Sequence, residues 1–208
     1  MPTRRHDAEQ PPGDPVVAAR IERAALEASA ELGYQRLTVE AIIGRAAVSR
    51  ATFYRLYDDR AGCFAKAYAK EADSLVARLL AGCRSAAGWR QGIDRVLAEL
   101  AGFAEAAPLL ANGIVVQARL AETPVTEKRA EALRTLADAM DAARRESDFS
   151  PPRIAAPFVI GAIESALVDA LLKSAPVEFA DAFPSLRYIA VATFFGPEVA
   201  RAEMKPGS

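Results

Sequence analysis

Apolar residues recur at spacings of three and four along most of this chain, which is the pattern of amphipathic helices. The first such stripe covers residues 16–32, and Gly33 is placed to end that helix because glycine readily adopts the backbone of a helix C-terminus. No segment shows the strict alternation of apolar and polar residues that marks a half-buried strand. The pattern therefore predicts an all-α chain of about nine helices.

The later helices are predicted by the same spacing, and prolines stand where several of them begin. Pro108, Pro124 and Pro184 suit first helical positions, where the missing N–H has no partner to lose. Segment 154–174 is apolar on most faces, so we expect more than one neighbour to bury it. Residues 175–181 are expected to connect two helices. The other predicted helices span residues 60–83, 89–106, 108–121, 124–145 and 184–195.

The stretch 38–57 is predicted to form two short helices joined by a tight turn at Ala47 and Val48. Thr38 and Ser49 are N-cap candidates, because a hydroxyl oxygen can accept a hydrogen bond from a free amide one turn into a helix. Two helices joined in this way make a helix-turn-helix, whose second helix enters the major groove of DNA.

The chemistry of this stretch agrees with DNA binding, since residues 45–57 hold three arginines and no acid. Arginine pairs with guanine edges and phosphates, and hydroxyl groups suit phosphates. We expect Arg50, in the first turn of the second helix, to contact a base edge. An ordinary helical hairpin with a solvated basic face fits the same spacing. The complete predicted DNA-binding set is Thr38, Arg45, Ser49, Arg50, Thr52, Tyr54, Tyr57 and Arg60, with phosphate roles for Thr38, Arg45, Tyr54 and Arg60 and either role for Thr52.

Residues 20–64 resemble the N-terminal domain of the TetR family of one-component bacterial repressors. The resemblance implies a three-helix DNA-binding domain over residues 16–61 and a helical ligand-binding and dimerisation domain over 62–197. It also implies that the helix from residue 60 acts as a lever between ligand and DNA. The matching positions are Ile21, Ala24, Ala25, Leu32, Gly33, Tyr34, Thr38, Val39, Ile42, Ala46, Val48, Ser49, Thr52, Phe53, Tyr54, Tyr57 and Phe64.

Three positions depart from the family pattern. Ala47 stands where the family usually has glycine, and Arg60 stands where it usually has lysine. Leu56 replaces a histidine found in many members, which removes one expected phosphate donor. From Ala47 we expect a turn that needs no positive φ, since only glycine adopts positive φ without cost.

The C-terminal half contains candidate dimer and ligand residues. Small residues on its two most apolar late helices permit close helix approach, although the same residues could close the core of one chain. The predicted dimer residues are Phe158, Gly161, Ala162, Ser165, Leu167, Leu171, Tyr188, Ile189 and Phe194. Polar residues within apolar helices indicate a small-molecule pocket, although each also fits a locally bonded side chain. The predicted ligand residues are Phe103, Asn112, Val116, Gln117 and Glu164.

Composition narrows the function classes. The only histidine is His6, in a segment expected to be a disordered tail over residues 1–15. The folded part therefore has no Ser-His-Asp site and no HExxH zinc site, and we expect no metal or cofactor. A net charge of −1 means that any attraction to DNA comes from a local patch, to which an arm of Arg4, Arg5 and His6 could add.

Targeting signals and cysteines add little. No apolar run is expected to span a membrane and no signal peptide is recognised, which favours a cytoplasmic protein. Cys63 and Cys83 are predicted on one helix about 30 Å apart, too far to bridge each other. They are expected to be buried or half-buried, and a thiol sensor is the alternative. Residues 198–208 are expected to form a loose tail.

The sequence therefore indicates a transcriptional repressor that binds a palindromic operator in double-stranded DNA as a homodimer. An unidentified apolar or amphipathic small molecule is expected to release it. A helical small-molecule-binding dimer without DNA binding and an all-α enzyme are the alternatives.

Overall fold

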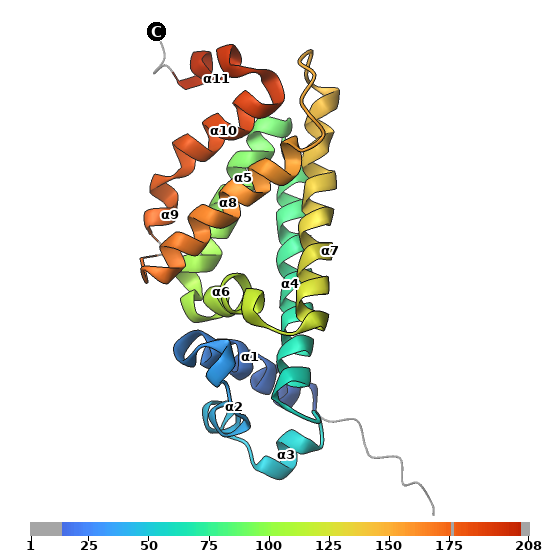
Figure 1. Cartoon of the computed structure of the whole chain (residues 1–208), viewed down its shortest axis with the longest axis vertical. Coiled ribbons are helices and arrows are strands. Elements are labelled where there is room, and N and C mark those ends of the chain that lie inside the picture. Colours follow the sequence, from blue (N-terminus) through green and yellow to red (C-terminus); the bar gives the residue numbers. More distant parts are fainter. Residues whose placement is uncertain (1–13, 176, 205–208) are drawn as a thin grey trace, which may run out of the picture.

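The computed structural model describes residues 14–175 and 177–204, which form eleven α-helices and three 3-10 turns and contain no strand. A small N-terminal bundle lies at one end of an elongated molecule, and a larger helical bundle fills the rest (Figure 1). The expected arm of Arg4, Arg5 and His6 lies outside the described residues, as does most of the expected disordered tail. Asp14 and Pro15 instead begin the first helix, where the Asp14 carboxylate accepts a hydrogen bond from the Val16 amide.

The N-terminal bundle consists of α1 (Pro15–Leu32), the 3-10 turn η1 (Tyr34–Arg36), α2 (Val39–Ala46) and α3 (Arg50–Tyr54). Both predicted N-caps are confirmed. The Thr38 hydroxyl accepts from the Ala41 amide at 3.1 Å, and the Ser49 hydroxyl accepts from the Thr52 amide at 3.0 Å. The bundle closes around fully buried apolar side chains, including Ile21, Leu26, Tyr34, Ile42 and Phe53 of its own elements and Phe64 of the helix that follows.

The turn between α2 and α3 differs from the prediction, because Ala47 adopts the left-handed conformation with φ 50° and ψ 50°. Its amide donates to the Gly44 carbonyl, and the Val48 amide donates to the Ile43 carbonyl at 3.2 Å. These bonds satisfy carbonyls at the C-terminus of α2 and require a left-handed residue at this point. This left-handed conformation costs a residue with a Cβ about 1–2 kcal/mol. The family's usual glycine adopts it without that cost, and this chain keeps the same backbone conformation with an alanine.

The longest helix, α4 (Arg60–Arg84), connects the two bundles. Its 25 residues extend about 37 Å. Asp59 caps it by accepting from the Gly62 amide at 2.7 Å. Its first half packs on α1, and its second half packs on α5 (Trp89–Ala106) and α7 (Thr123–Met140). α4 therefore contacts both bundles.

The two cysteines lie on α4, with Cys63 buried in the N-terminal bundle and Cys83 exposed near the other end. Burial raises the pKa of both thiols, that of Cys63 to about 12. A thiolate is the reactive form of cysteine, so the environment of Cys63 favours an unreactive thiol over a thiol sensor, whereas Cys83 is exposed and not buried or half-buried as expected.

The remaining elements build the larger bundle. In Figure 1, α4 and α7 run side by side opposite α5 and α8 (Ala155–Leu172), and α6 (Pro108–Val115) crosses beneath them, directly above α1. The turns η2 (Gln117–Leu120) and η3 (Asp141–Arg145) flank α7. The predicted connection over 175–181 contains one helical turn, α9 (Glu178–Asp181), and α10 (Phe183–Phe195) then packs on α8.

The expectation of a loose tail from residue 198 is wrong, because α11 (Pro197–Met204) packs on α10. Ala200 is buried in the core of the larger bundle. The Glu203 carboxylate pairs with Arg90 of α5 and Arg187 of α10. The sequence pattern shows no long apolar stripe here, and one partner of this helix, Arg90, lies 113 residues before Glu203.

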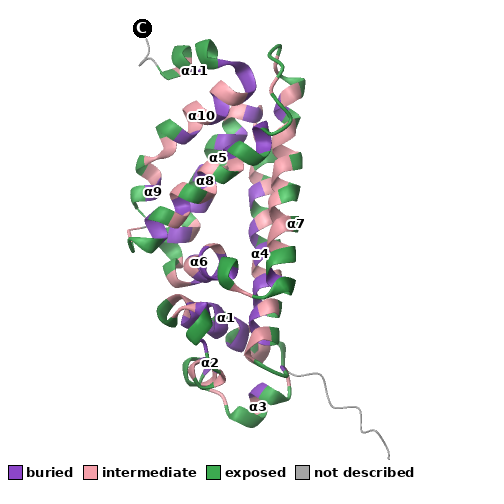
Figure 2. Ribbon diagram, in the orientation of Figure 1, coloured by how far each residue is buried: buried purple, intermediate pink, exposed green. Residues whose placement is uncertain are grey.

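The expectation that no apolar run reaches membrane-span length is also wrong for α8, by length and composition alone. Its 18 residues have a mean hydropathy of 1.7. One side of α8 is buried against α6, α7 and α10, and its other side is exposed, as the alternation of purple and green along α8 in Figure 2 shows. The exposed side includes Phe158, at 58% exposure, and Leu172.

Candidate functional site

The face formed by α2 and α3 lies at the tip of the molecule, at the far end from the C-terminus (Figure 1). Arg50 and Tyr54 are exposed on α3, the second helix of the helix-turn-helix. Thr38 and Ser49 are exposed at the helix starts, and the half-buried Thr52 lies 2.9 Å from Ser49 through their hydroxyl oxygens. This part of the predicted DNA-binding set therefore lies together on one accessible surface.

Both predicted arginines of this face have acidic partners in the free protein. Arg50 pairs with Glu40 of α2, and both side chains are more than half exposed. Arg45 pairs with Glu27 and Glu31 of α1, whose carboxylates raise its pKa. Exposed ion pairs contribute about 0–1 kcal/mol, so a phosphate or a base edge can replace these partners. The acids also reduce the net positive charge of the surface.

Tyr57 requires a correction to the predicted set. Its side chain is 6% exposed, and its hydroxyl donates to the Glu22 carboxylate at 2.9 Å. Burial, and then Glu22, raise the pKa of Tyr57. The Lys70 ammonium donates to the same carboxylate from α4 at 2.9 Å. Tyr57 therefore holds the end of the recognition helix to α1 and α4 rather than facing DNA. Its position four residues after the buried Phe53 was the available sequence signal.

Arg60 is half-buried at the start of α4. Its guanidinium donates to the Tyr34 carbonyl at 3.0 Å and lies 5.2 Å from the centre of the Tyr34 ring. These contacts join α4 to the turn that follows α1, so in this conformation Arg60 has a structural partner in place of the predicted phosphate.

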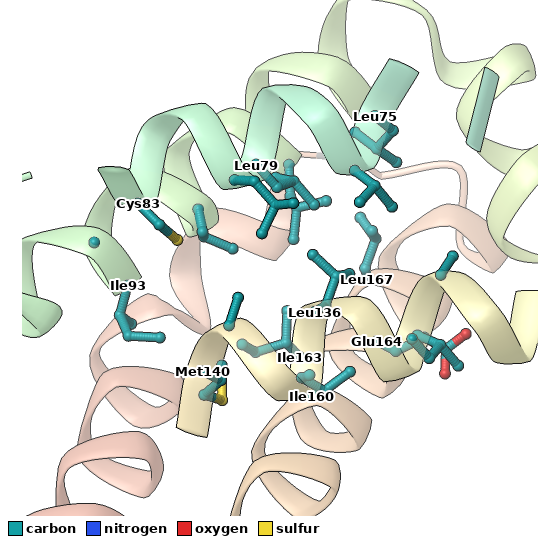
Figure 3. A pocket seen from close by; sticks show the side chains of 18 of the residues that line it. Leu75, Leu79, Cys83, Ile93, Leu136, Met140, Ile160, Ile163, Glu164 and Leu167 are labelled. Carbon is teal, nitrogen blue, oxygen red and sulfur yellow. The ribbon is translucent and has the colours of Figure 1, made fainter. Parts of the chain in front are cut away.

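A cavity of about 300 Å³ lies in the larger bundle, between α4, α5, α7 and α8. Figure 3 shows Leu75 and Leu79 of α4 facing Leu136 and Met140 across it. Its lining extends along α4 from Tyr68 to Cys83, fifteen residues apart, which corresponds to about 22 Å. Other apolar side chains in the lining include Ile93, Val96, Leu133, Ile160, Ile163 and Leu167.

The few polar groups of the cavity lie on different helices. Arg129 of α7 and Glu164 of α8 form an ion pair whose side chains are 25% and 20% exposed. Tyr68 of α4 lies 97% buried in the same lining. Glu146 accepts from the Trp89 amide at 3.2 Å. An apolar cavity with a few polar groups is the usual form of a small-molecule site.

Of the predicted ligand residues, only Glu164 is in the lining of this cavity. Gln117 accepts from the Tyr34 amide at 2.9 Å and donates to Asn112 at 3.0 Å, so this pair ties the two bundles together. Val116 is buried, and Phe103 lies under the Arg78 guanidinium. Neither Tyr68 nor Arg129 was among the predicted ligand residues, because helical periodicity indicates which side chains are buried but not what they face.

The predicted dimer residues divide into two groups. Leu167, Leu171 and Phe194 are buried within the chain, so they fill its core and cannot form a surface. The others remain accessible on α8 and α10, with Phe158, Gly161 and Ser165 exposed and Ala162, Tyr188 and Ile189 half-buried. Those six residues are here called the α8/α10 face. A Cβ added at Gly161 would meet nothing within 4 Å.

The arrangement defines the class as a helical DNA-binding protein, in which a helix-turn-helix is joined by one long helix to a bundle with an apolar cavity. Residues 21–67 match the model of the bacterial regulatory proteins of the tetR family. The match identifies the N-terminal segment as a DNA-binding domain of the kind found in that family of transcriptional regulators.

Solved structures share the fold over most of the chain. FadR, a fatty acid degradation regulator from Bacillus halodurans, has a TM-score of 0.71 at 16% identity, covering 83% of this chain and 96% of its own. FadR from Bacillus subtilis in complex with stearoyl-CoA has a TM-score of 0.72 at 16% identity, covering 84% and 97%. TylP, a tetR regulator from Streptomyces fradiae, has a TM-score of 0.65 at 17% identity, covering 91% of each chain. A comparison with curated proteins found no match.

Replacement of the exposed arginine of α3 tests its predicted role. Arg50→Ala is expected to weaken binding to the preferred DNA by about 1–3 kcal/mol and to relax the preference at one base pair, because arginine discriminates guanine through paired hydrogen bonds. The measurement is competitive binding of selected and random DNA at one salt concentration. Tyr54→Phe is the matched phosphate control and should weaken all sequences nearly equally. An equal loss on both DNAs with Arg50→Ala would contradict base reading.

Proposed function

We propose that this protein is a cytoplasmic repressor that binds a palindromic operator as a homodimer and releases it when a slender apolar or amphipathic molecule fills the cavity. The observation that carries the proposal is that α4 both lines the cavity and packs against α1. We assign residues 16–61 to DNA binding and residues 62–204 to ligand binding and dimerisation, extending the expected second domain to include α11.

The shape of the cavity supports a long ligand. About 22 Å of length with a volume of about 300 Å³ suits a slender chain better than a wide ring system. The structurally similar FadR of Bacillus subtilis was solved with stearoyl-CoA, which contains such a chain. Each buried methylene contributes about 0.8 kcal/mol, or roughly fourfold in affinity, so a chain that fills the cavity binds tightly.

The α8/α10 face supports homodimerisation. It presents apolar and small side chains to solvent over two adjacent helices, and small residues let helices of a second chain approach closely. A two-fold dimer presents two recognition helices to two half-sites whose centres lie about 34–36 Å apart, or a multiple of this. A palindromic operator follows from that symmetry.

Two helices connect the cavity to the DNA-binding bundle. Ile114 and Val115 of α6 line the cavity, and the preceding Gly113 lies so close to α1 that an added Cβ would be 2.6 Å from the Leu26 carbonyl oxygen. A ligand that moves α4 and α6 therefore changes the spacing of the two recognition helices. The ligand shifts the equilibrium toward the released conformation only if it binds that conformation more tightly than the DNA-binding one. A coupling of about 1–3 kcal/mol lowers DNA affinity roughly 5- to 150-fold.

The test is to bind the protein to DNA flanking its own gene and to titrate single-chain alkyl compounds of increasing length. Release is expected to improve by about fourfold per methylene until the chain fills the cavity. The dimer mass should persist during release. Splitting of the dimer, or a ligand site on the α2–α3 surface, would contradict the mechanism. Ligand binding without any DNA binding would favour the alternative of a helical small-molecule-binding dimer.

A further inference from the structure

One group of cavity residues is polar, and its three members come from three helices. Tyr68, Arg129 and Glu164 project from α4, α7 and α8 into the lining of the same cavity. Tyr68 is 3% exposed as a residue, and within residues 14–175 and 177–204 its hydroxyl has no hydrogen-bond partner. A ligand atom that accepts the proton of this hydroxyl therefore adds a hydrogen bond without displacing a protein partner.

Tyr68 is a donor under ordinary conditions. Burial raises its pKa to about 12, Arg129 acts in the opposite direction, and Glu164 adds to the rise. The phenol therefore keeps its proton near neutral pH. Arg129 can add a second hydrogen bond, since a guanidinium carries five N–H groups and its pairing with Glu164 does not use them all. Tyr68 and Arg129 thus offer donors to one acceptor atom, and Glu164 holds the Arg129 guanidinium beside them.

The charges around these donors decide what kind of acceptor fits. Arg129 and Glu164 neutralise each other, and the neighbouring Lys128 pairs with Asp73 at 2.8 Å. A ligand carboxylate would lie beside the Glu164 carboxylate without a free cation, where a low dielectric strengthens the repulsion. An alkyl cation would have to compete with Arg129 for Glu164. A neutral hydrogen-bond acceptor is not repelled by Glu164 and does not have to displace Arg129.

We propose that Tyr68, Arg129 and Glu164 form the head-group subsite of the cavity, and that the effector is a neutral long-chain carbonyl compound such as an ester, thioester or amide. The proposal rests on the proposed function, in which this cavity is the effector site. The carbonyl oxygen accepts from Tyr68 and Arg129, and the chain extends along α4 toward Cys83. The contact joins α4, the helix that reaches the DNA-binding bundle, to α7 and α8.

The chain carries its own reporter for the test. Trp89 is the only tryptophan, and it lies in the cavity lining. Its fluorescence in the full-length protein can follow titration with four probes of equal chain length, namely methyl dodecanoate, dodecanamide, dodecanoate and dodecyltrimethylammonium. The two neutral compounds are expected to bind about tenfold more tightly than the two ions. This ratio corresponds to about 1.4 kcal/mol of binding free energy, which each ion loses because its charge finds no free partner in the cavity.

Two substitutions separate the roles of the subsite residues. Tyr68→Phe is expected to weaken both neutral probes about fivefold and to leave dodecyltrimethylammonium unchanged, because only an acceptor uses the lost hydroxyl. Glu164→Gln should raise dodecanoate affinity about tenfold by leaving the Arg129 charge for the ligand, with little effect on the ester. Tyr34→Phe, in the N-terminal bundle outside the cavity lining, removes a buried hydroxyl that has no partner; it is the matched control and should change none of the four affinities.

The possible failures are distinguishable. If dodecanoate binds as tightly as the ester, or if Tyr68→Phe leaves dodecanamide binding unchanged, the head-group subsite is wrong while the cavity remains the effector site. If none of the four probes changes Trp89 fluorescence or releases operator DNA, the proposed function of the cavity fails as well. A thermal melt of each variant checks that it is folded.

Discussion

Gly161→Arg is expected to turn the protein into a monomer that fails to bind operator DNA at concentrations that saturate the wild type. Gly161 lies exposed on α8, and an added Cβ would meet nothing within 4 Å, so one chain accommodates the larger residue. In a dimer built on the α8/α10 face, two guanidinium groups would be buried near each other. Burying unpaired charge costs several kcal/mol per ion, enough to separate the chains. Sedimentation gives the mass, and a gel shift gives the DNA binding.

The matched control for this variant is Gly102→Arg. Gly102 is also exposed in the middle of a helix, α5, and a Cβ there would likewise meet nothing within 4 Å. Both substitutions replace glycine by a better helix former, so neither should unfold the chain. Gly102→Arg is expected to remain dimeric and to bind DNA. A wild-type mass for Gly161→Arg would show that the two chains meet on another surface.

Gly113→Ala is expected to lower the free energy of unfolding by about 1–3 kcal/mol, the usual cost of overfilling a packed contact. The added Cβ would lie 2.6 Å from the Leu26 carbonyl oxygen and 3.0 Å from its carbon, and backbone atoms cannot rotate away. α6 must therefore move off α1. Because the next two residues of α6 line the cavity, operator affinity should fall in the absence of any ligand. Urea unfolding and operator titration measure the two effects.

Gly102→Ala provides the comparison of equal size. In open space within a helix, this change should stabilise the protein by about 0.5–1 kcal/mol, since alanine loses less backbone entropy on folding than glycine. If the two variants had the same stability, the approach of α6 to α1 would not constrain residue 113. If Gly113→Ala lost stability but kept full operator affinity, α6 would not transmit the ligand signal.

In the helix-turn-helix, the two helix caps were predicted correctly, whereas the conformation of the turn and the burial of Tyr57 were not. Thr38 and Ser49 cap their helices as predicted, because capping depends on residues within one turn of each other. Ala47 was misread, since the backbone of a turn depends on the hydrogen bonds that close the preceding helix. Tyr57 was misread as well, because its buried partner Glu22 lies 35 residues earlier in the sequence.

Hydrophobic periodicity sufficed to identify the helices. The limits of α5 were predicted correctly, and α1, α4, α8 and α10 were predicted within two residues at each end. These segments carry their signals locally, as stripes at helical spacing, prolines at the starts and glycines at the ends. α11 was missed, because it carries no long apolar stripe and one of its partners, Arg90, lies 113 residues before Glu203.

The sequence therefore contains the helices, their buried sides and the DNA-reading motif, because each depends on neighbours within a few residues. Only the tertiary structure decides what each buried side meets. Leu171 and Phe194 face the core of the chain, Phe158 faces solvent, and Tyr68 faces a cavity, although all four are large and occupy apolar helical stripes. Helical spacing fixes the direction of a side chain around its own axis, whereas its surroundings depend on how helices far apart in the chain pack together.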